Sequence, residues 1–238
     1  MNFSSRSYQK ELLDRTDLPF EAIEKNMQEL DIINTYLGGH AITISGFKKL
    51  LNGKKEISIC EIGCGGGDNL LAIRKWCDSK NITLQITGVD INPDCIRVAR
   101  EKFPDLDAHL VTADFREVEF GNQMPDIIFA SLFCHHFTHE ELLTVFQWMD
   151  RNSGLGWFIN DLHRHPIAYH AIRLLTSVFS RSYLVKNDAP LSVLRGFRRT
   201  ELEKLLSASG FIGYSLVWKW AFRWLMIIKH DGNKIGSI

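Results

Sequence analysis

Four glycines fall within five residues where an apolar run meets a helical pattern, in the stretch CEIGCGGGDNLL, residues 60–71. A glycine turn that leaves a buried strand and opens a helix lets backbone N–H groups approach a ligand, and the helix N-terminus favours negative charge beside it. This feature favours an α/β fold in which a ligand lies against the turn, and a tight strand-to-helix turn without a ligand is the alternative.

The chain after residue 54 alternates between short apolar runs and amphipathic helical patterns. Apolar runs lie at 56–63, 84–90, 108–115, 125–133 and 156–161, with helical patterns at 68–77, 93–103 and 139–149. Such alternation predicts βαβ units and a mostly parallel sheet. Two last runs, 212–220 and 222–229, are almost contiguous, so they are expected to pair as an antiparallel hairpin.

Two segments lie outside this alternation. Apolar residues recur at helical spacing over 18–37, and Gly38-Gly39 is expected to stop that helix. Residues 163–198 are expected to form an insertion over the carboxyl edge of the sheet, where open α/β sheets bind ligands. The expected organisation is a helical cap at 1–50, a core at 51–230 with the lid-like insertion 163–198, and a flexible tail at 231–238.

Composition limits the partners. Lys+Arg and Asp+Glu each number 28, so no long-range positive field for nucleic acid is expected. Five cysteines without a C-x-x-C pair indicate reduced thiols in a cytoplasm rather than disulfides or a zinc knuckle. No membrane span is expected, because Lys219 and Arg223 interrupt the most apolar tract. A small-molecule substrate and a homodimer are the expected partners.

Two familiar phosphate-binding turns do not fit the glycines. No Lys-Ser or Lys-Thr follows them, as a P-loop requires. The dinucleotide pattern G-x-G-x-x-G begins at Gly63 and Gly65 but has Asp68 in its third glycine position, where a carboxylate would repel a pyrophosphate.

The stretch EIGCGGGD resembles the E/D-x-G-x-G-x-G motif of class I S-adenosylmethionine-dependent methyltransferases. Later motifs agree in order: ITGVDINP at 86–93, LVTADF at 110–115 and PDIIFASLFCHHF at 125–137. The resemblance implies a Rossmann-like α/β fold with a seven-stranded, mostly parallel sheet, and S-adenosylmethionine as cofactor. The residues it implies for the cofactor are Glu61, Gly63, Cys64, Gly65, Gly67, Asp90, Ile91, Asp114, Phe115 and Ser131.

Specific roles follow from the same resemblance. The glycine loop and the acid Glu61 lie near the methionine part of the cofactor, Asp90 holds the ribose hydroxyls, and Asp114 and Phe115 hold and cover the adenine. Within the superfamily the chain is similar to small-molecule enzymes of the ubiquinone/menaquinone and polyketide or phenol type. The N-P-P-Y motif of amino-group methylation is absent after the fourth strand, where Ser131-Leu132-Phe133-Cys134 stands.

Candidate catalytic residues are His135, His136 and His163, one of which could take a proton from a phenol or enol. Local packing is the alternative for each. Arg164, Tyr183 and Arg195 are candidates for substrate binding, against structural ion pairs or a solvated face. No metal is expected, because no third ligand lies at helical or strand spacing from the His-x-His pair, His163 and His165.

The insertion carries an apolar stripe that could be a lid over the acceptor, part of the core or a dimer face: Tyr169, Leu174, Leu175, Phe179, Tyr183 and Leu184. The expected activity is methyl transfer to an oxygen or carbon nucleophile of a small aromatic, polyketide or quinol-like molecule. The alternative is a non-catalytic S-adenosylmethionine-binding sensor or assembly module.

Overall fold

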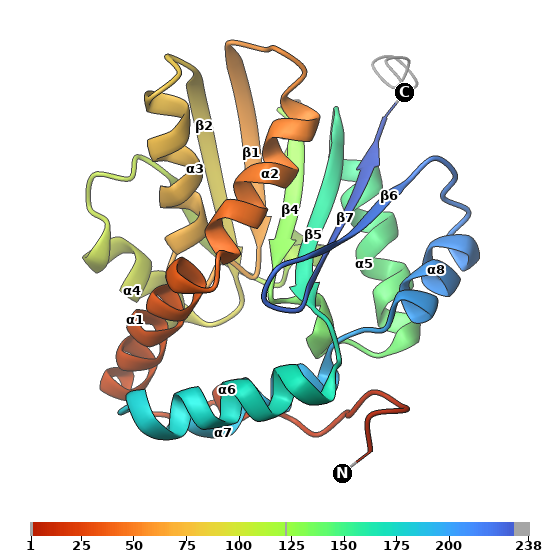
Figure 1. The fold of residues 1–238 in the computed structure, drawn as a ribbon. Helices are drawn as coiled ribbons and strands as arrows, with labels where there is room; N and C mark the ends of the chain where they lie inside the picture. The colour runs from red at the N-terminus through yellow and green to blue at the C-terminus, as the bar shows by residue number, and fades with distance from the viewer. Residues whose placement is uncertain (1, 122, 231–238) are drawn as a thin grey trace.

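A seven-stranded sheet in the order β3-β2-β1-β4-β5-β7-β6 forms the centre of the computed structural model, which describes residues 2–121 and 123–230 (Figure 1). Strands β1 to β5 run parallel to one another, whereas β7 is antiparallel to both β5 and β6. The expected mostly parallel sheet with an antiparallel terminal hairpin is confirmed. The strands are β1 Glu56–Ile62, β2 Thr83–Asp90, β3 His109–Thr112, β4 Ile127–Ser131, β5 Gly156–Leu162, β6 Ser215–Lys219 and β7 Arg223–Lys229.

Helices cover both faces of this sheet. They are α1 Phe20–Tyr36, α2 Gly39–Leu51, α3 Asp68–Asp78, α4 Pro93–Lys102, α5 His139–Asn152, α6 Pro166–Phe179, α7 Tyr183–Arg195 and α8 Arg199–Ala208, with short 3-10 turns η1 Leu12–Asp14, η2 Phe115–Glu117 and η3 Cys134–His136. Local chemistry sets several starts: Asn92 caps α4 ahead of Pro93, and Thr138 and Glu141 form a capping box on α5.

Two apolar cores result, one on each face. Side chains of α2, α3 and α4 pack on one face around Phe129 and Phe158, whose rings stack 5.0 Å apart. Side chains of α5 and α8 pack on the other face around Phe146 and Trp157. Because both faces are covered, every residue of β4 is buried, as is typical of parallel sheets.

The N-terminal region differs from the expected single helix. Gly38, with φ of +76°, does end α1, but a second helix, α2, begins directly at Gly39. Helix α2 lies close enough to β5 that a Cβ on Gly46 would come within 2.6 Å of the Phe158 ring. It also contributes Phe47 and Leu50 to the core.

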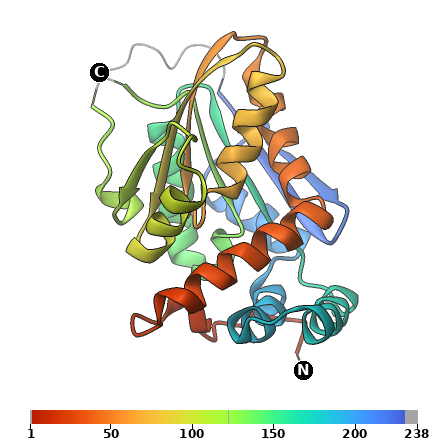
Figure 2. The same ribbon diagram turned by 90° about the vertical axis from the view of Figure 1, so that its left-hand side faces the viewer.

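The carboxyl ends of the parallel strands meet at one edge, and other segments lie across that edge. In Figures 1 and 2, α1, α6 and α7 lie at this end of the sheet. The expected helical insertion after the fifth strand is present as α6 and α7. The predicted tail at 231–238 lies outside the described residues. Among the helices described, none has the length and apolar character needed to cross a bilayer.

Candidate active site

The glycine turn between β1 and α3 adopts a backbone that strongly favours glycine. Gly63, Gly65 and Gly67 have φ of +66°, +51° and +76°, in the left-handed region. A Cβ on Gly63 would lie 2.1 Å from the Phe133 ring, which follows β4. From the other side, Met27 of α1 reaches the turn, with its Sδ 3.3 Å from a Cβ built on Gly65. The turn is therefore packed closely between Phe133, which follows β4, and Met27 of α1, and glycine at these positions allows that close approach.

Asp90, the last residue of β2, is tied to this turn. Its Oδ2 accepts a hydrogen bond of 2.9 Å from the Gly65 N–H, and its Oδ1 accepts one of 2.9 Å from the Asn92 N–H. Each oxygen keeps a second lone pair, so the carboxylate can still accept from a ligand. Burial raises the pKa of Asp90 above its ordinary value.

Glu61, near the end of β1, has an unsatisfied oxygen. Its Oε1 accepts from Asn69 Nδ2 at 3.1 Å, whereas the buried Oε2 has no hydrogen-bond partner among the described residues. Burial, together with the nearby charge of Asp68, raises the pKa of Glu61 well above its usual value. Burial also raises the pKa of Asp68. Three carboxyl groups held this way favour a ligand with positive charge and N–H donors.

This donor set fits S-adenosylmethionine. The cofactor carries an ammonium and a sulfonium, which suit Glu61 and its acidic neighbours, and a ribose diol, which suits the two oxygens of Asp90. A pyrophosphate would meet Glu61, Asp68 and Asp90 together, and like charges repel. The unpartnered Oε2 and the left-handed glycine backbone beside it are the observations on which this fit depends.

The remaining predicted cofactor residues lie around the same strand ends. Asp114 caps η2 through the Arg116 N–H at 3.0 Å, and its carboxylate also pairs with the Arg116 guanidinium. Phe115 is buried edge-on against Trp148, with the ring centres 5.2 Å apart. Ile91 is 69% exposed. Cys64 and Ser131 are buried, and Ser131 accepts a hydrogen bond from Asn160 at 3.4 Å.

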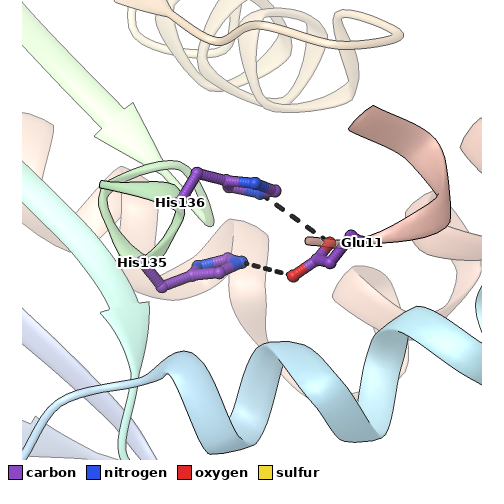
Figure 3. Close-up of side chains that lie close together, drawn as sticks. All are labelled: Glu11, His135 and His136. Carbon is purple, nitrogen blue, oxygen red and sulfur yellow. Dashed lines mark ion pairs between the residues drawn. The ribbon is translucent and has the colours of Figure 1, made fainter. Parts of the chain in front are cut away.

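His135 and His136 lie on η3, facing Glu11 of the N-terminal segment, residues 2–15 (Figure 3). His135 is 3% exposed, and its Nδ1 is 2.8 Å from Asp161 Oδ1 on β5. Burial alone would lower the pKa of His135, but the charges of Asp161 and Glu11 outweigh it and raise this pKa to about 9. A protonated imidazole cannot accept a proton, so His135 is a poor general base near neutral pH.

His136 is more accessible than its neighbour. Its Nδ1 is 3.2 Å from Asp14 Oδ1, and its Nε2 is 3.8 Å from Glu11 Oε2. Asp14 and Glu11 had no predicted role, because residues 1–15 carry no apolar pattern and these two acids approach the histidines only in the folded chain. Asp161, which orients His135, was equally missed.

His163 lies elsewhere along the sheet edge. It follows β5, and its Nδ1 accepts a hydrogen bond from Trp218 Nε1 at 3.2 Å. Burial, helped by the charges of His165, Arg164 and Arg198, lowers the pKa of His163 to about 4. Since the neutral ring already uses its acceptor nitrogen, His163 has no free lone pair for a substrate proton.

The two predicted substrate arginines contact the N-terminal segment instead of an open space. Arg164 is 1% exposed and pairs with Glu201 at 2.6 Å while donating to the Phe3 carbonyl at 3.0 Å. Arg195 donates to the carbonyls of Gln9 at 2.6 Å and His136 at 2.9 Å. Their positive charges are therefore engaged within the chain.

The apolar stripe of the insertion divides between two environments. Tyr169 and Leu184 are buried, whereas Leu174, Phe179 and Tyr183 are more than half exposed. Leu175 is half-buried, so the stripe is not uniformly buried.

Known proteins resemble this chain over most of its length. Demethylmenaquinone methyltransferase of Chlorobaculum parvum is 23% identical over 176 residues, which cover 69% of each chain. The solved structure of the plantazolicin methyltransferase BpumL in complex with SAH superposes with a TM-score of 0.67 at 18% identity, covering 91% of this chain and 92% of that one. At this identity the superposition shows the fold alone.

A family profile described as "Methyltransferase domain" matches residues 59–156, from β1 to the start of β5. The matched region contains the glycine turn, Asp90, Asp114 and the histidine pair. The chain is a class I S-adenosylmethionine-dependent methyltransferase.

The methyltransferase is of the small-molecule type. A further relative, malonyl-[acyl-carrier protein] O-methyltransferase of Acetivibrio thermocellus, is 28% identical over 113 residues. That match covers 47% of this chain but only 32% of the relative. The chain therefore spans about a third of that protein, and the two relatives differ in the acceptors that their names state.

Proposed function

We propose that this methyltransferase transfers a methyl group to an oxygen or carbon nucleophile of a small aromatic, quinol-like or polyketide-like molecule. The observation that carries the proposal is the acid-lined glycine turn, which packs against Phe133 directly ahead of the histidine pair at the carboxyl edge of the sheet. The demethylmenaquinone methyltransferase relative supports a quinol-like acceptor.

The cofactor residues are proposed in the roles that the motif resemblance implies. Glu61 and the backbone of Gly63, Gly65 and Gly67 would hold the methionine part, and Asp90 the ribose. Asp114 would accept the adenine amino group and Phe115 would cover the ring, and Ile91, Cys64 and Ser131 would contact the cofactor without a more specific role. When bound, S-adenosylmethionine supplies an electrophilic methyl group on its sulfonium.

The chain's own contribution is alignment and exclusion of water. Holding two reactants in line can lower a barrier by about 7–11 kcal/mol. If the acceptor arrives protonated, His136 is the better placed base, because it is more exposed than His135 and keeps contact with Asp14 and Glu11. Arg164, Arg195, Tyr183 and His163 do not enter this proposed acceptor site, since the first two hold the N-terminal segment, Tyr183 faces solvent and His163 is bonded to Trp218.

Cofactor binding is tested with Asp90→Ala. Isothermal titration with S-adenosylhomocysteine should give micromolar affinity for the wild type and a loss of about 100-fold or more in the variant, since two ribose hydrogen bonds to a charged group disappear. Asp105→Ala, which removes an exposed carboxylate in the loop after α4, is the matched control. Unchanged affinity in Asp90→Ala, with circular dichroism showing a folded protein, would contradict the proposed cofactor site.

The alternative function is a non-catalytic S-adenosylmethionine-binding module, and no observation in residues 2–121 and 123–230 favours it. Measuring turnover distinguishes the enzyme from this module. A panel of phenols, quinols and polyketides should yield S-adenosylhomocysteine with at least one acceptor.

Homodimerisation also stays a prediction. Multi-angle light scattering would report the mass of two chains if it is right and of one chain if it is wrong.

A further inference from the structure

Three side chains converge where the N-terminal segment crosses the end of β4. Glu11 precedes η1, and His135 and His136 belong to η3 (Figure 3). One ligand-type atom from each lies within 4.8 Å of the other two. His135 Nε2 is 3.4 Å from Glu11 Oε1, and His136 Nε2 is 3.8 Å from Glu11 Oε2. Two ligand atoms bound to one tetrahedral zinc ion lie roughly 3.3–3.5 Å apart, so these separations are close to coordination spacing.

His135 presents an unsatisfied nitrogen to this cluster. The side chain is almost fully buried, yet its Nε2 makes no hydrogen bond within the described residues. Buried polar atoms are nearly always partnered, and each exception requires an explanation. This nitrogen points towards Glu11 at a distance too long for a good hydrogen bond, which leaves room for a cation between them.

Both imidazoles are also held from behind by a carboxylate. His135 Nδ1 lies 2.8 Å from Asp161 Oδ1, and His136 Nδ1 lies 3.2 Å from Asp14 Oδ1. Metal-binding histidines usually donate their other ring N–H to a carboxylate or carbonyl, which fixes the tautomer and aims the free lone pair at the metal. The same arrangement occurs here on both rings.

The surrounding charges leave an excess of negative charge. Three carboxylates face the cluster, Glu11, Asp14 and Asp161, against two guanidiniums, Arg195 and Arg6. Arg195 Nε is 3.8 Å from Glu11 Oε1. The Arg195 guanidinium also donates hydrogen bonds to the backbone carbonyls of His135 and His136, so it is held against the η3 backbone. Zinc binding displaces the proton from His135 Nε2, and once both imidazoles are neutral the three negative charges outnumber the two positive ones.

A second cluster of similar composition lacks these features. His40 has both ring nitrogens bonded, to Asn69 at 3.1 Å and to Asp31 at 3.1 Å. Lys102 already supplies a cation to Asp31 at 2.6 Å. The Asp31–His40–Asp68 cluster is thus satisfied within the chain and provides an internal control.

We propose that Glu11, His135 and His136 bind one divalent transition-metal ion, of which zinc best matches two imidazoles and one carboxylate. The ion would fasten the N-terminal segment to η3 beside the proposed acceptor site. Because the ion would occupy the lone pair of His136, the metal-bound chain would not use His136 as a base. A tetrahedral ion with three protein ligands keeps one position for water or another small ligand. Local sequence spacing hides this set, because Glu11 joins the adjacent histidines only in the folded chain.

Zinc binding to the full chain tests the site. Chelator-treated protein is titrated with ZnCl₂ by calorimetry, and Co²⁺ is added separately to record the visible absorption of a tetrahedral site. We expect one ion per chain, and an affinity lower by about 10–100-fold or more in Glu11→Gln and in His136→Gln. The control His40→Gln should bind as the wild type does. Circular dichroism establishes that each variant is folded.

Three results would overturn the site: no zinc binding by the folded wild type, unchanged affinity in both ligand variants, or a loss confined to His40→Gln. If Glu11→Gln does not fold, His136→Gln carries the test, because its side chain is 24% exposed and tolerates replacement more easily.

Discussion

His163 gives the residue-scale prediction, because its pKa in the folded chain is lowered to about 4. An unfolded histidine titrates near 6.5, so between pH 6.5 and 4 the unfolded state binds more protons than the folded state. The free energy of unfolding therefore falls as pH drops through this window, and His163 has no such effect above it. His163→Phe should remove about 1 kcal/mol of that loss after allowance for partial exposure.

The measurement is urea unfolding at pH 7 and at pH 4.5. The difference in unfolding free energy between the two pH values should be smaller in His163→Phe than in the wild type. Phenylalanine keeps the ring that packs against Trp224 and Phe222. His139→Phe changes an exposed histidine of α5 and serves as control. Equal acid losses in wild type and His163→Phe would show that His163 does not titrate as described.

At the scale of elements, the glycine turn between β1 and α3 allows the cost of backbone strain to be separated from the cost of a side-chain clash. Gly63→Ala imposes two costs, a left-handed backbone at φ of +66° and a contact of 2.1 Å with the Phe133 ring. Gly53→Ala imposes the first cost alone, since its φ is +77° and nothing lies within 4 Å of its Cβ. Strain of the first kind costs about 1–2 kcal/mol, and overpacking adds about 1–3 kcal/mol.

Chemical denaturation of the two variants should therefore rank Gly63→Ala below Gly53→Ala in unfolding free energy by about 1–3 kcal/mol. Gly63→Ala should also weaken S-adenosylhomocysteine binding, whereas Gly53→Ala should not. Equal stabilities would mean that Phe133 moves away from Gly63 without cost.

The elements that could be predicted from sequence are those with a local cause. The parallel strands follow from apolar runs separated by helical patterns, and the glycine turn carries its own conformational requirement. Helix α2 was missed because Gly38-Gly39 is a typical helix stop, whereas here a left-handed Gly38 links two helices. The positions of Glu11 and Asp14 depend on long-range contacts to η3 and α7, which no local pattern encodes.

At the scale of the whole molecule, the N-terminal segment closes the carboxyl edge through a few buried contacts. Asp188 of α7 is 6% exposed and accepts hydrogen bonds from the N–H groups of Leu12 at 2.8 Å and Leu13 at 3.0 Å. Hydrogen bonds to a charged group contribute about 1.5–3 kcal/mol each. Asp188→Asn keeps the shape but removes the charge and turns one acceptor into a donor that faces an N–H group. The opened population of the segment should rise by about tenfold or more, because each 1.4 kcal/mol is a factor of ten.

Limited trypsin digestion followed by intact-mass spectrometry measures this opening, since Arg6, Lys10 and Arg15 lie in or next to the segment. Asp188→Asn should be cut there at least several-fold faster than wild type under conditions where the core stays intact. Asp105→Asn, an exposed carboxamide substitution, should leave the rate unchanged. Because the segment also carries Glu11, a rate in Asp188→Asn that zinc lowers again would connect closure of the edge to the proposed metal site. Equal cutting rates in Asp188→Asn and wild type would show instead that the other contacts of the segment, among them those of Arg6, Arg164 and Arg195, suffice to hold it closed.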